Sequence, residues 1–215
     1  MATTISGSSG VTFPAGGVGN PAGAVVGTTD TQTLTNKTLG AGLVAGASYL
    51  TSGTVNAGGT NPFPVSSGPT NVDFTGIPSW VKRITVIFSG VSLSGTADPV
   101  IVLGTGGTPT YASSGYAGIY ISQAGVSVGN LSTYFRVSTL ATAAATLYGT
   151  ATFTLLTGNT WVCNSALGNG TTTGANQSSY CQGSIALAAA LTAVRITTTN
   201  GTDTFDAGSI NILYE

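Results

Sequence analysis

The segment VKRITVIFSGVSL, residues 81–93, decides the fold class of this chain. Its side chains alternate with a period of two, which is the spacing of a β-strand and not the 3.6-residue spacing of a helix. Arg83, Thr85 and Ile87 then point to one side of the strand. Three apolar side chains point to the other side: Ile84, Val86 and Phe88. The segment therefore predicts a strand that covers a hydrophobic core with one of its faces.

The same alternation recurs from Asp73 onward, most clearly in TLYGTATFTLL (146–156) and GSINILYE (208–215). Further candidate strands are Pro99–Gly104, Gly118–Ser122, Ser132–Ser138, Ser184–Ala189 and Ala193–Thr199. Asn200-Gly201 is typical of a type I′ hairpin turn, because both turn positions need positive φ. About eight strands, with only 139–147 as an alternative helical turn, predict an all-β fold, an antiparallel sandwich of jelly-roll type.

The first 60 residues have a different pattern. Pro14, Pro21 and many glycines exclude a helix or a long regular strand there. We therefore expect an extended N-terminal arm over residues 1–60 and a β-sandwich domain over residues 61–215.

Charge is scarce throughout the chain. Charged residues make up 5% of the sequence, against about 25% in ordinary soluble domains. A monomer with so few charges is poorly protected against association, so the composition predicts a surface that is largely covered by other subunits. A net charge of −1 gives no basic patch for nucleic acid. The longest mostly apolar run, Ile185–Val194, is half the length of a membrane span, so no membrane partner is expected.

Catalytic chemistry finds little support in the residue types. The chain has no His, which excludes a Ser-His-Asp site and removes the main general base at neutral pH. The glycine loop in VIVLGTGG is not followed by a helix that could receive a pyrophosphate. Asp203, Asp206 and Asn200 lack calcium-loop spacing and fit turn residues better. We predict that the chain is not an enzyme and uses no cofactor or metal.

The two cysteines, Cys163 and Cys181, bracket a segment rich in Gly, Asn, Thr and Ser. A disulfide between them would stabilise the fold by about 3 kcal/mol through loop closure. Two reduced cysteines are the default for a protein made in a cytosol, so both states stay open.

Aromatic and basic residues suggest further contacts. Trp80 is expected to plug one end of the sandwich, with a carbohydrate-stacking surface as the alternative, while the position of Trp161 stays open. Arg83, Arg136 and Arg195 all fall in expected strands and need acidic partners. We predict partners among the aspartates and the C-terminal carboxylates, with ion pairs at subunit interfaces as the hypothesis.

Two phrases near the N-terminus carry a resemblance. VTFPAGG (11–17) followed by GTTDTQTLTNKTLG (27–40) resembles a segment shared by tailed-bacteriophage fibre and virion-surface proteins, and the β region is similar to the β-sandwich C-terminal domains of such proteins. The resemblance implies a homotrimer with an intertwined arm and a β knob. Residues expected to act in virion attachment or assembly are Asp30, Thr33, Leu34, Asn36, Lys37 and Leu39.

The resemblance implies a virion structural protein, assembled in the bacterial host cytoplasm. The leading expectation is a short tail fibre, attached through its arm, whose distal knob meets the host surface. The alternative is a capsid decoration or head-fibre protein. Expected partners are identical subunits, other tail or capsid proteins and, as a guess from the aromatic and Asn-rich loops, a host surface glycan.

Overall fold

The computed structural model describes residues 63–64, 68–123, 127–140, 142–171 and 176–215. All described residues belong to one unit of the chain, Gly46–Glu215. The predicted arm and its six attachment residues lie outside the described part. The described residues form thirteen strands and no helix, in two antiparallel sheets, which confirms the predicted all-β sandwich.

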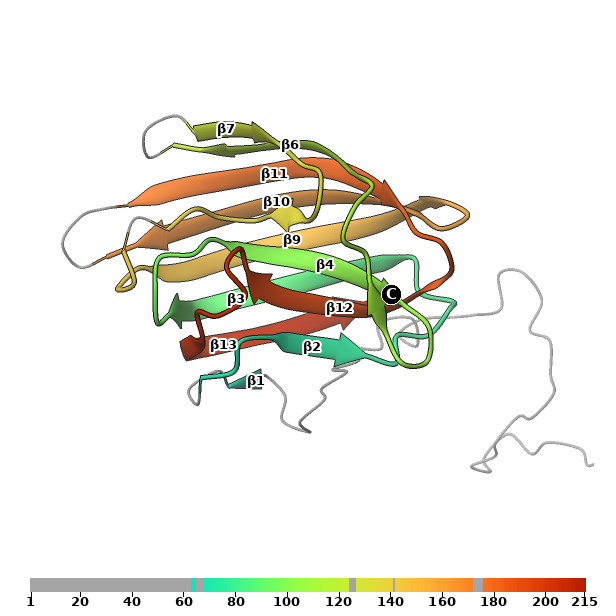
Figure 1. Cartoon of the computed structure of the whole chain (residues 1–215), viewed down its shortest axis with the longest axis horizontal. Helices are drawn as coiled ribbons and strands as arrows, with labels where there is room; N and C mark the ends of the chain where they lie inside the picture. Colours follow the sequence, from blue (N-terminus) through green and yellow to red (C-terminus); the bar gives the residue numbers. More distant parts are fainter. Residues whose placement is uncertain (1–62, 65–67, 124–126, 141, 172–175) are drawn as a thin grey trace, which may run out of the picture. The chain divides into compact units, whose positions relative to one another are not determined.

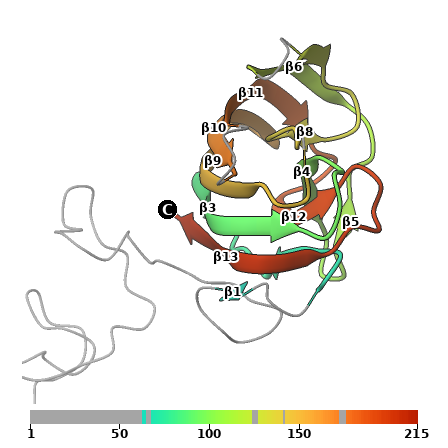
Figure 2. The ribbon, with the colours of Figure 1, turned by 90° about the vertical axis from the view of Figure 1, so that its left-hand side faces the viewer.

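The larger sheet has eight strands (Figure 1). In spatial order they are β1 (Phe63–Pro64), β13 (Phe205–Tyr214), β3 (Arg83–Leu93), β9 (Thr146–Thr157), β10 (Thr160–Gly170), β11 (Gln177–Ala186), β6 (Tyr116–Ser122) and β7 (Ser127–Asn130). The smaller sheet contains β2 (Val72–Thr75), β12 (Leu191–Thr198), β4 (Pro99–Thr105) and β5 (Thr110–Tyr111), with β8 (Phe135–Arg136) also paired to β4. The end-on view shows the larger sheet curving around the smaller one (Figure 2).

The connections follow the strand order of a jelly roll. In the smaller sheet, β2, β12, β4 and β8 occupy the places of jelly-roll strands B, I, D and G. In the larger sheet, β3, β6 and β7 occupy the places of C, E and F, and the meander β9–β10–β11 stands where a jelly roll has its single H strand. This expansion makes the larger sheet wide, and β13 and β1 extend it further.

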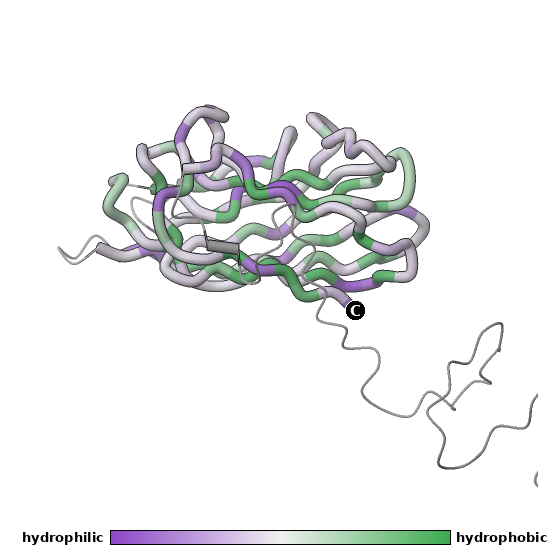
Figure 3. Tube along the Cα trace, turned by 90° about the horizontal axis from the view of Figure 1, so that it is seen from below, coloured by the Kyte–Doolittle hydropathy of each residue, from purple (hydrophilic) through white to green (hydrophobic). Residues whose placement is uncertain are grey.

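The core lies between the sheets and is built from the alternate positions that the sequence indicates. Ile84, Val86 and Phe88 on β3 are all buried. Phe135 contacts Tyr116 and Phe153, with ring centroids 4.9 and 5.5 Å apart. Hydrophobic positions recur along the strands of the β domain, and strongly hydrophilic ones are few (Figure 3). Phe135 lies on β8 of the smaller sheet, whereas Tyr116 and Phe153 lie on β6 and β9 of the larger sheet, so these three rings connect the two sheets.

Part of the interior is polar, which explains why β10 and most of β11 were not predicted. The inward residues of these strands include Ser165, Asn169 and Ser179. Asn169 donates hydrogen bonds to Ser138 Oγ at 2.9 Å and to the carbonyl of Thr139 at 2.7 Å. Because these inward residues are small and polar, they do not differ in polarity from the outward residues. The alternation that indicates a strand is therefore missing from the sequence here.

Three local predictions need correction. Asn200-Gly201 forms a turn, with φ of 67° at Gly201, but β12 before it and β13 after it lie in different sheets, so it is not a hairpin. The described part of 139–147 holds an isolated turn, in which Ala145 N donates to Thr142 O, and then β9. The expected strand Ser132–Ser138 is reduced to the two residues of β8.

Candidate functional site

The outward side chains of β9, β10, β11, β6 and β7 form a surface that we call the uncharged face. From Pro99 to Val194 the only charged residue is Arg136, and it lies on β8 of the smaller sheet. Large apolar side chains are exposed on the uncharged face: Ile119, Val128, Tyr148, Leu156, Val162 and Tyr180. Among the described residues, the other exposed large hydrophobic side chains are Ile87, on neighbouring β3, and Trp80.

Neutral polar side chains fill the rest of the uncharged face. Thr150 and Thr154 on β9, Asn164 on β10 and Gln182 on β11 all point outward. Sheets that face water commonly carry charged residues, which prevent association. A broad surface of apolar and neutral polar groups is instead typical of the buried centre of a protein interface, where charged residues are depleted.

Two tyrosines border a shallow groove on this face. The strand register places Tyr148 opposite Gly168 and Tyr180 opposite Ala166, so the two rings rise on either side of the small residues of β10. The groove has a volume of about 340 Å³. Gly149 in its lining has a φ of 132°, and a Cβ there would lie 2.3 Å from the carbonyl oxygen of Ala166. Glycine is therefore required for the close approach of β9 to β10.

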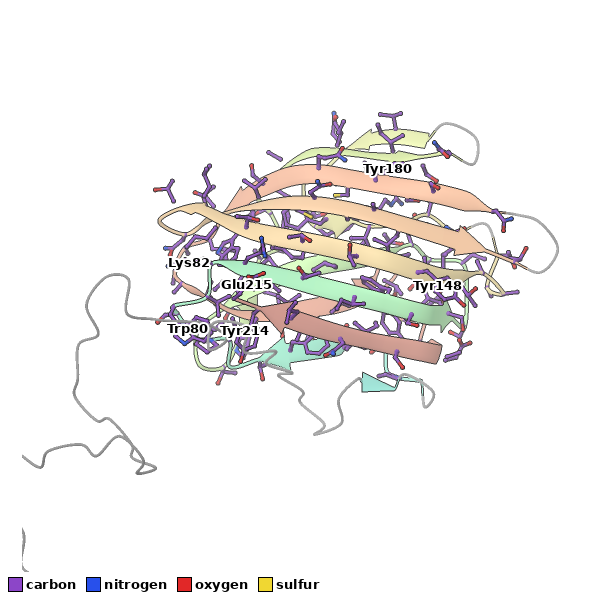
Figure 4. All side chains as sticks on the ribbon, turned by 180° about the vertical axis from the view of Figure 1, so that it is seen from behind. Trp80, Lys82, Tyr148, Tyr180, Tyr214 and Glu215 are labelled. Carbon is purple, nitrogen blue, oxygen red and sulfur yellow. The ribbon has the colours of Figure 1, made fainter. Side chains whose placement is uncertain are left out.

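Charged residues gather at one end of the larger sheet. Lys82 and Glu215 lie there, at a distance from Tyr148 and Tyr180 (Figure 4). Arg83 Nε donates to Glu215 Oε1 at 2.6 Å. The charge on this sheet therefore lies on or beside β3 and β13, with Lys82, Arg83 and Glu215 at one end and Asp206 at the other, where β13 begins.

The outer side of the smaller sheet carries a second surface, which we call the Arg195 basin. Strands β12 and β4 form its floor with Arg195, Thr197 and Val102, and three loops, at residues 111–113, 133–134 and 199–201, form its walls. Tyr111, the last residue of β5, and Tyr134, just before β8, are among its lining residues. The basin is shallow and open to solvent, with a volume of about 490 Å³.

A salt bridge and an aromatic ring fix the centre of the basin. Arg195 Nε and Nη2 donate to the two carboxylate oxygens of Asp73, at 2.7 and 2.6 Å. The guanidinium carbon lies 4.1 Å from the centre of the Tyr111 ring. The hydrogen bond with Asp73 raises the pKa of Arg195, and burial, followed by the charge of Asp73, raises the pKa of Tyr111 to about 12. The group is therefore rigid, and its net charge is zero.

All three predicted arginines find acidic partners within the chain. Arg195 pairs with Asp73, Arg136 with Asp98 and Arg83 with Glu215. These partners are among the aspartates and C-terminal carboxylates that the sequence suggested. Neutralising these arginines does not require a neighbouring subunit, so the interface hypothesis gains no support from charge balance and stays a prediction.

Cys163 and Cys181 face the core from neighbouring strands and are free thiols in the structure. Burial raises the pKa of the Cys163 thiol well above its ordinary value, and a hydrogen bond with Cys181 adds to this effect. Reactive cysteines need a lowered pKa and solvent access. The pair therefore acts as core packing in this structure.

The prediction that Trp80 plugs the sandwich is wrong. Trp80 is 50% exposed and packs against Tyr214, with ring centroids 5.8 Å apart. Pro78 O accepts a hydrogen bond from Val81 N, and this turn leaves Val81 buried while Trp80 points outward. The buried tryptophan is Trp161, which lines a cavity of about 90 Å³ with Val81.

Other kinds of site have little material in the described residues. No group of three or more His, Cys, Asp or Glu side chains is placed to hold a metal ion there. Asn200 and Asp203 organise a turn, in which the Asn200 side chain donates to Asp203 at 2.9 Å, while Asp206 accepts a hydrogen bond from Ser92. No helix in the described ranges is long and apolar enough to cross a membrane.

The chain matches no protein family model, no curated protein and no solved structure. Its function is therefore inferred from the chemistry of its own surfaces and from its N-terminal segment, residues 27–40.

Proposed function

We propose that this chain is a structural protein of a tailed-bacteriophage virion: a short trimeric tail fibre, attached through residues 1–60, with the β domain as the knob that meets the host. The uncharged face carries the proposal. The resemblance of residues 27–40 to a segment of phage fibre proteins supplies the kind of particle. The protein would be made in the host cytoplasm and function in the assembled virion.

The physical support is the cost of leaving the uncharged face in water. Burial of apolar surface is favourable at about 25 cal/mol per Å², and six large apolar side chains are exposed on this face. Because few charged groups would lose their hydration, covering the face carries little electrostatic penalty. Three copies around a threefold axis would bury this face against neighbouring subunits.

A capsid decoration or head-fibre protein is the second candidate. The uncharged face supports it as well, because a protein on the capsid surface would also cover this face against neighbouring subunits. Electron microscopy of virions labelled with an antibody to this chain separates the two roles. Label at the tail supports the fibre, label over the shell supports decoration, and absence from virions contradicts both.

The Ala166→Lys variant tests the assembly claim. Ala166 is exposed in the middle of the uncharged face, so the substitution adds a charge without crowding the core. We expect light scattering to give three times the subunit mass of 21.1 kDa for the native chain and a smaller mass for the variant. Thr108→Lys, in an exposed loop, is the matched control and should not change the mass. A native monomer would contradict the proposal.

A further inference from the structure

We infer that the Arg195 basin is a binding site for a neutral saccharide. The basin lies on the smaller sheet, away from the uncharged face, so this inference does not depend on the proposed function. A saccharide presents apolar C–H faces and a rim of hydroxyl groups. A site for it needs aromatic surface together with paired donors and acceptors, and the basin contains both.

Tyr134 supplies the aromatic surface. It is half-buried just before β8 and lines the basin. A tyrosine ring combines an apolar body with a polar tip and suits a ligand of mixed character. Tyr111 is less available, because its ring already lies against Arg195 and Gly104. Tyr134 is therefore expected to pack on the sugar ring.

Arg195 supplies directed hydrogen bonds. Its salt bridge uses Nε and Nη2, which leaves the N–H groups of Nη1 on the far side of a planar guanidinium. The Asp73 carboxylate has further lone pairs besides those used by Arg195. Hydrogen bonds to charged groups are stronger than neutral ones, and here the donor and acceptor are already held in place. Thr197 and Asn71, which line the same basin, add a hydroxyl and an amide.

Charge balance selects a neutral ligand. Among the described residues, Arg195 is the only charged one that lines the basin, and its salt bridge with Asp73 neutralises it. An acidic sugar or a phosphate would find no net positive charge. An apolar peptide would find the apolar surface of Val102, Ala112 and Tyr134 interrupted by hydroxyl and amide groups.

The same arrangement favours binding over hydrolysis. Glycoside hydrolysis ordinarily uses two carboxyl groups on opposite sides of the scissile bond. No carboxylate is among the described residues that line the basin, and both oxygens of Asp73, the partner of Arg195, accept hydrogen bonds from it. The saccharide is therefore expected to be held without being cleaved.

The test is an array of immobilised oligosaccharides probed with the full-length chain. Neutral members contain glucose, galactose, rhamnose or N-acetylglucosamine, and acidic members contain sialic acid, uronic acid or phosphate. We expect binding to one or more neutral members that changes little with salt concentration. Binding to no neutral member, or only to acidic members, would overturn the inference.

Variants of the basin then test where the glycan binds. The affinity of each variant is measured by titration calorimetry in solution, with the glycan that the array identifies. Tyr134→Ala should weaken the affinity by about tenfold or more. Arg195→Lys keeps the charge but loses the fork geometry, and it should weaken binding in the same direction. Tyr148→Ala, on the uncharged face, is the matched control and should leave the affinity unchanged. Equal affinity in the native chain and both basin variants would contradict the site.

The two proposals fail in different ways. Ala166→Lys should lower the subunit count and keep the saccharide affinity of each subunit, because the substitution lies on the other sheet. Tyr134→Ala should lose saccharide binding and still assemble normally, and this result would show that the two sites are independent. A variant that loses both properties together would contradict the assignment of two independent surfaces.

Discussion

The outer faces of the two sheets cover the same core and differ in almost every other respect. The uncharged face is broad, exposes large apolar side chains and has no ionisable group that is charged at neutral pH. The Arg195 basin is concave and contains a bidentate salt bridge between charged residues of β12 and β2. The difference suggests that the outer face of one sheet packs against protein and that of the other binds a small polar ligand.

The largest effect is expected at a backbone contact beneath the uncharged face. Gly149→Ala should destabilise the domain by about 3 kcal/mol, because the new Cβ would collide with the backbone of β10 at a positive φ. Gly158→Ala is the matched control: its φ is 54°, but a Cβ there meets no atom within 4 Å, so about 1 kcal/mol is expected. Urea unfolding compares the two variants, and equal losses would show that the close approach of β9 to β10 is unimportant.

An intermediate effect concerns the loop that forms one wall of the basin. The Tyr116 hydroxyl donates to Ala112 O at 3.2 Å and accepts a hydrogen bond from Leu103 N at 3.1 Å. Burial raises the pKa of Tyr116 from 10.0 to about 12. The pKa of Tyr116 is higher in the folded chain than in the unfolded chain. The stabilisation of the fold by the neutral hydroxyl is therefore complete below pH 10 and is lost as the pH rises towards 12. Between these limits the loss is at most about 2.7 kcal/mol.

Tyr116→Phe isolates this contribution. At about pH 8 the variant should be less stable than the native chain by about 1 to 3 kcal/mol, because Leu103 N loses its acceptor. At about pH 11 the difference in stability between the variant and the native chain should be smaller by about 1.4 kcal/mol. The tyrosine hydroxyl ionises more readily in the unfolded chain than in the folded chain, and this lowers the stability of the native chain at that pH. A gap in urea midpoints that stays constant between the two pH values would contradict this role.

The smallest effect is expected at the salt bridge itself. Asp73→Asn should cost about 1 kcal/mol, because both partners are partly exposed to solvent. The cost should shrink at high salt, where the pair is screened. Thr154→Asn, on the uncharged face, changes a side chain without touching a charge and should show no such salt dependence. Identical salt responses would remove the electrostatic contrast between the two sheets.

The sequence predicts the fold where apolar side chains alternate with polar ones. Strands β3 and β13 follow directly from Ile84, Val86, Ile210 and Ile212, which are all buried. The pattern fails at β10, because its inward positions include Ser165 and Asn169, which resemble the outward residues in polarity. The wide meander that creates the uncharged face was therefore the least predictable part of the sheet.

The sites are harder to predict than the fold because they join distant residues. Asp73 and Arg195 lie 122 positions apart and meet only through the register of β2 with β12. Scarce charge predicts a covered surface without saying which sheet provides it. The wrong prediction for Trp80 has a local cause, because a single turn before β3 buries Val81 and leaves Trp80 pointing outward.

The most direct test of the uncharged face as a subunit contact is hydroxyl-radical footprinting of the full-length chain, read residue by residue by mass spectrometry. Tyr148 and Tyr180 are 54% and 39% exposed in a single subunit, and Trp80 is 50% exposed. We predict that Tyr148 and Tyr180 are protected relative to Trp80 in the native assembly and become reactive in Ala166→Lys. Reactivity of both tyrosines in the native chain equal to that in the variant would contradict the account.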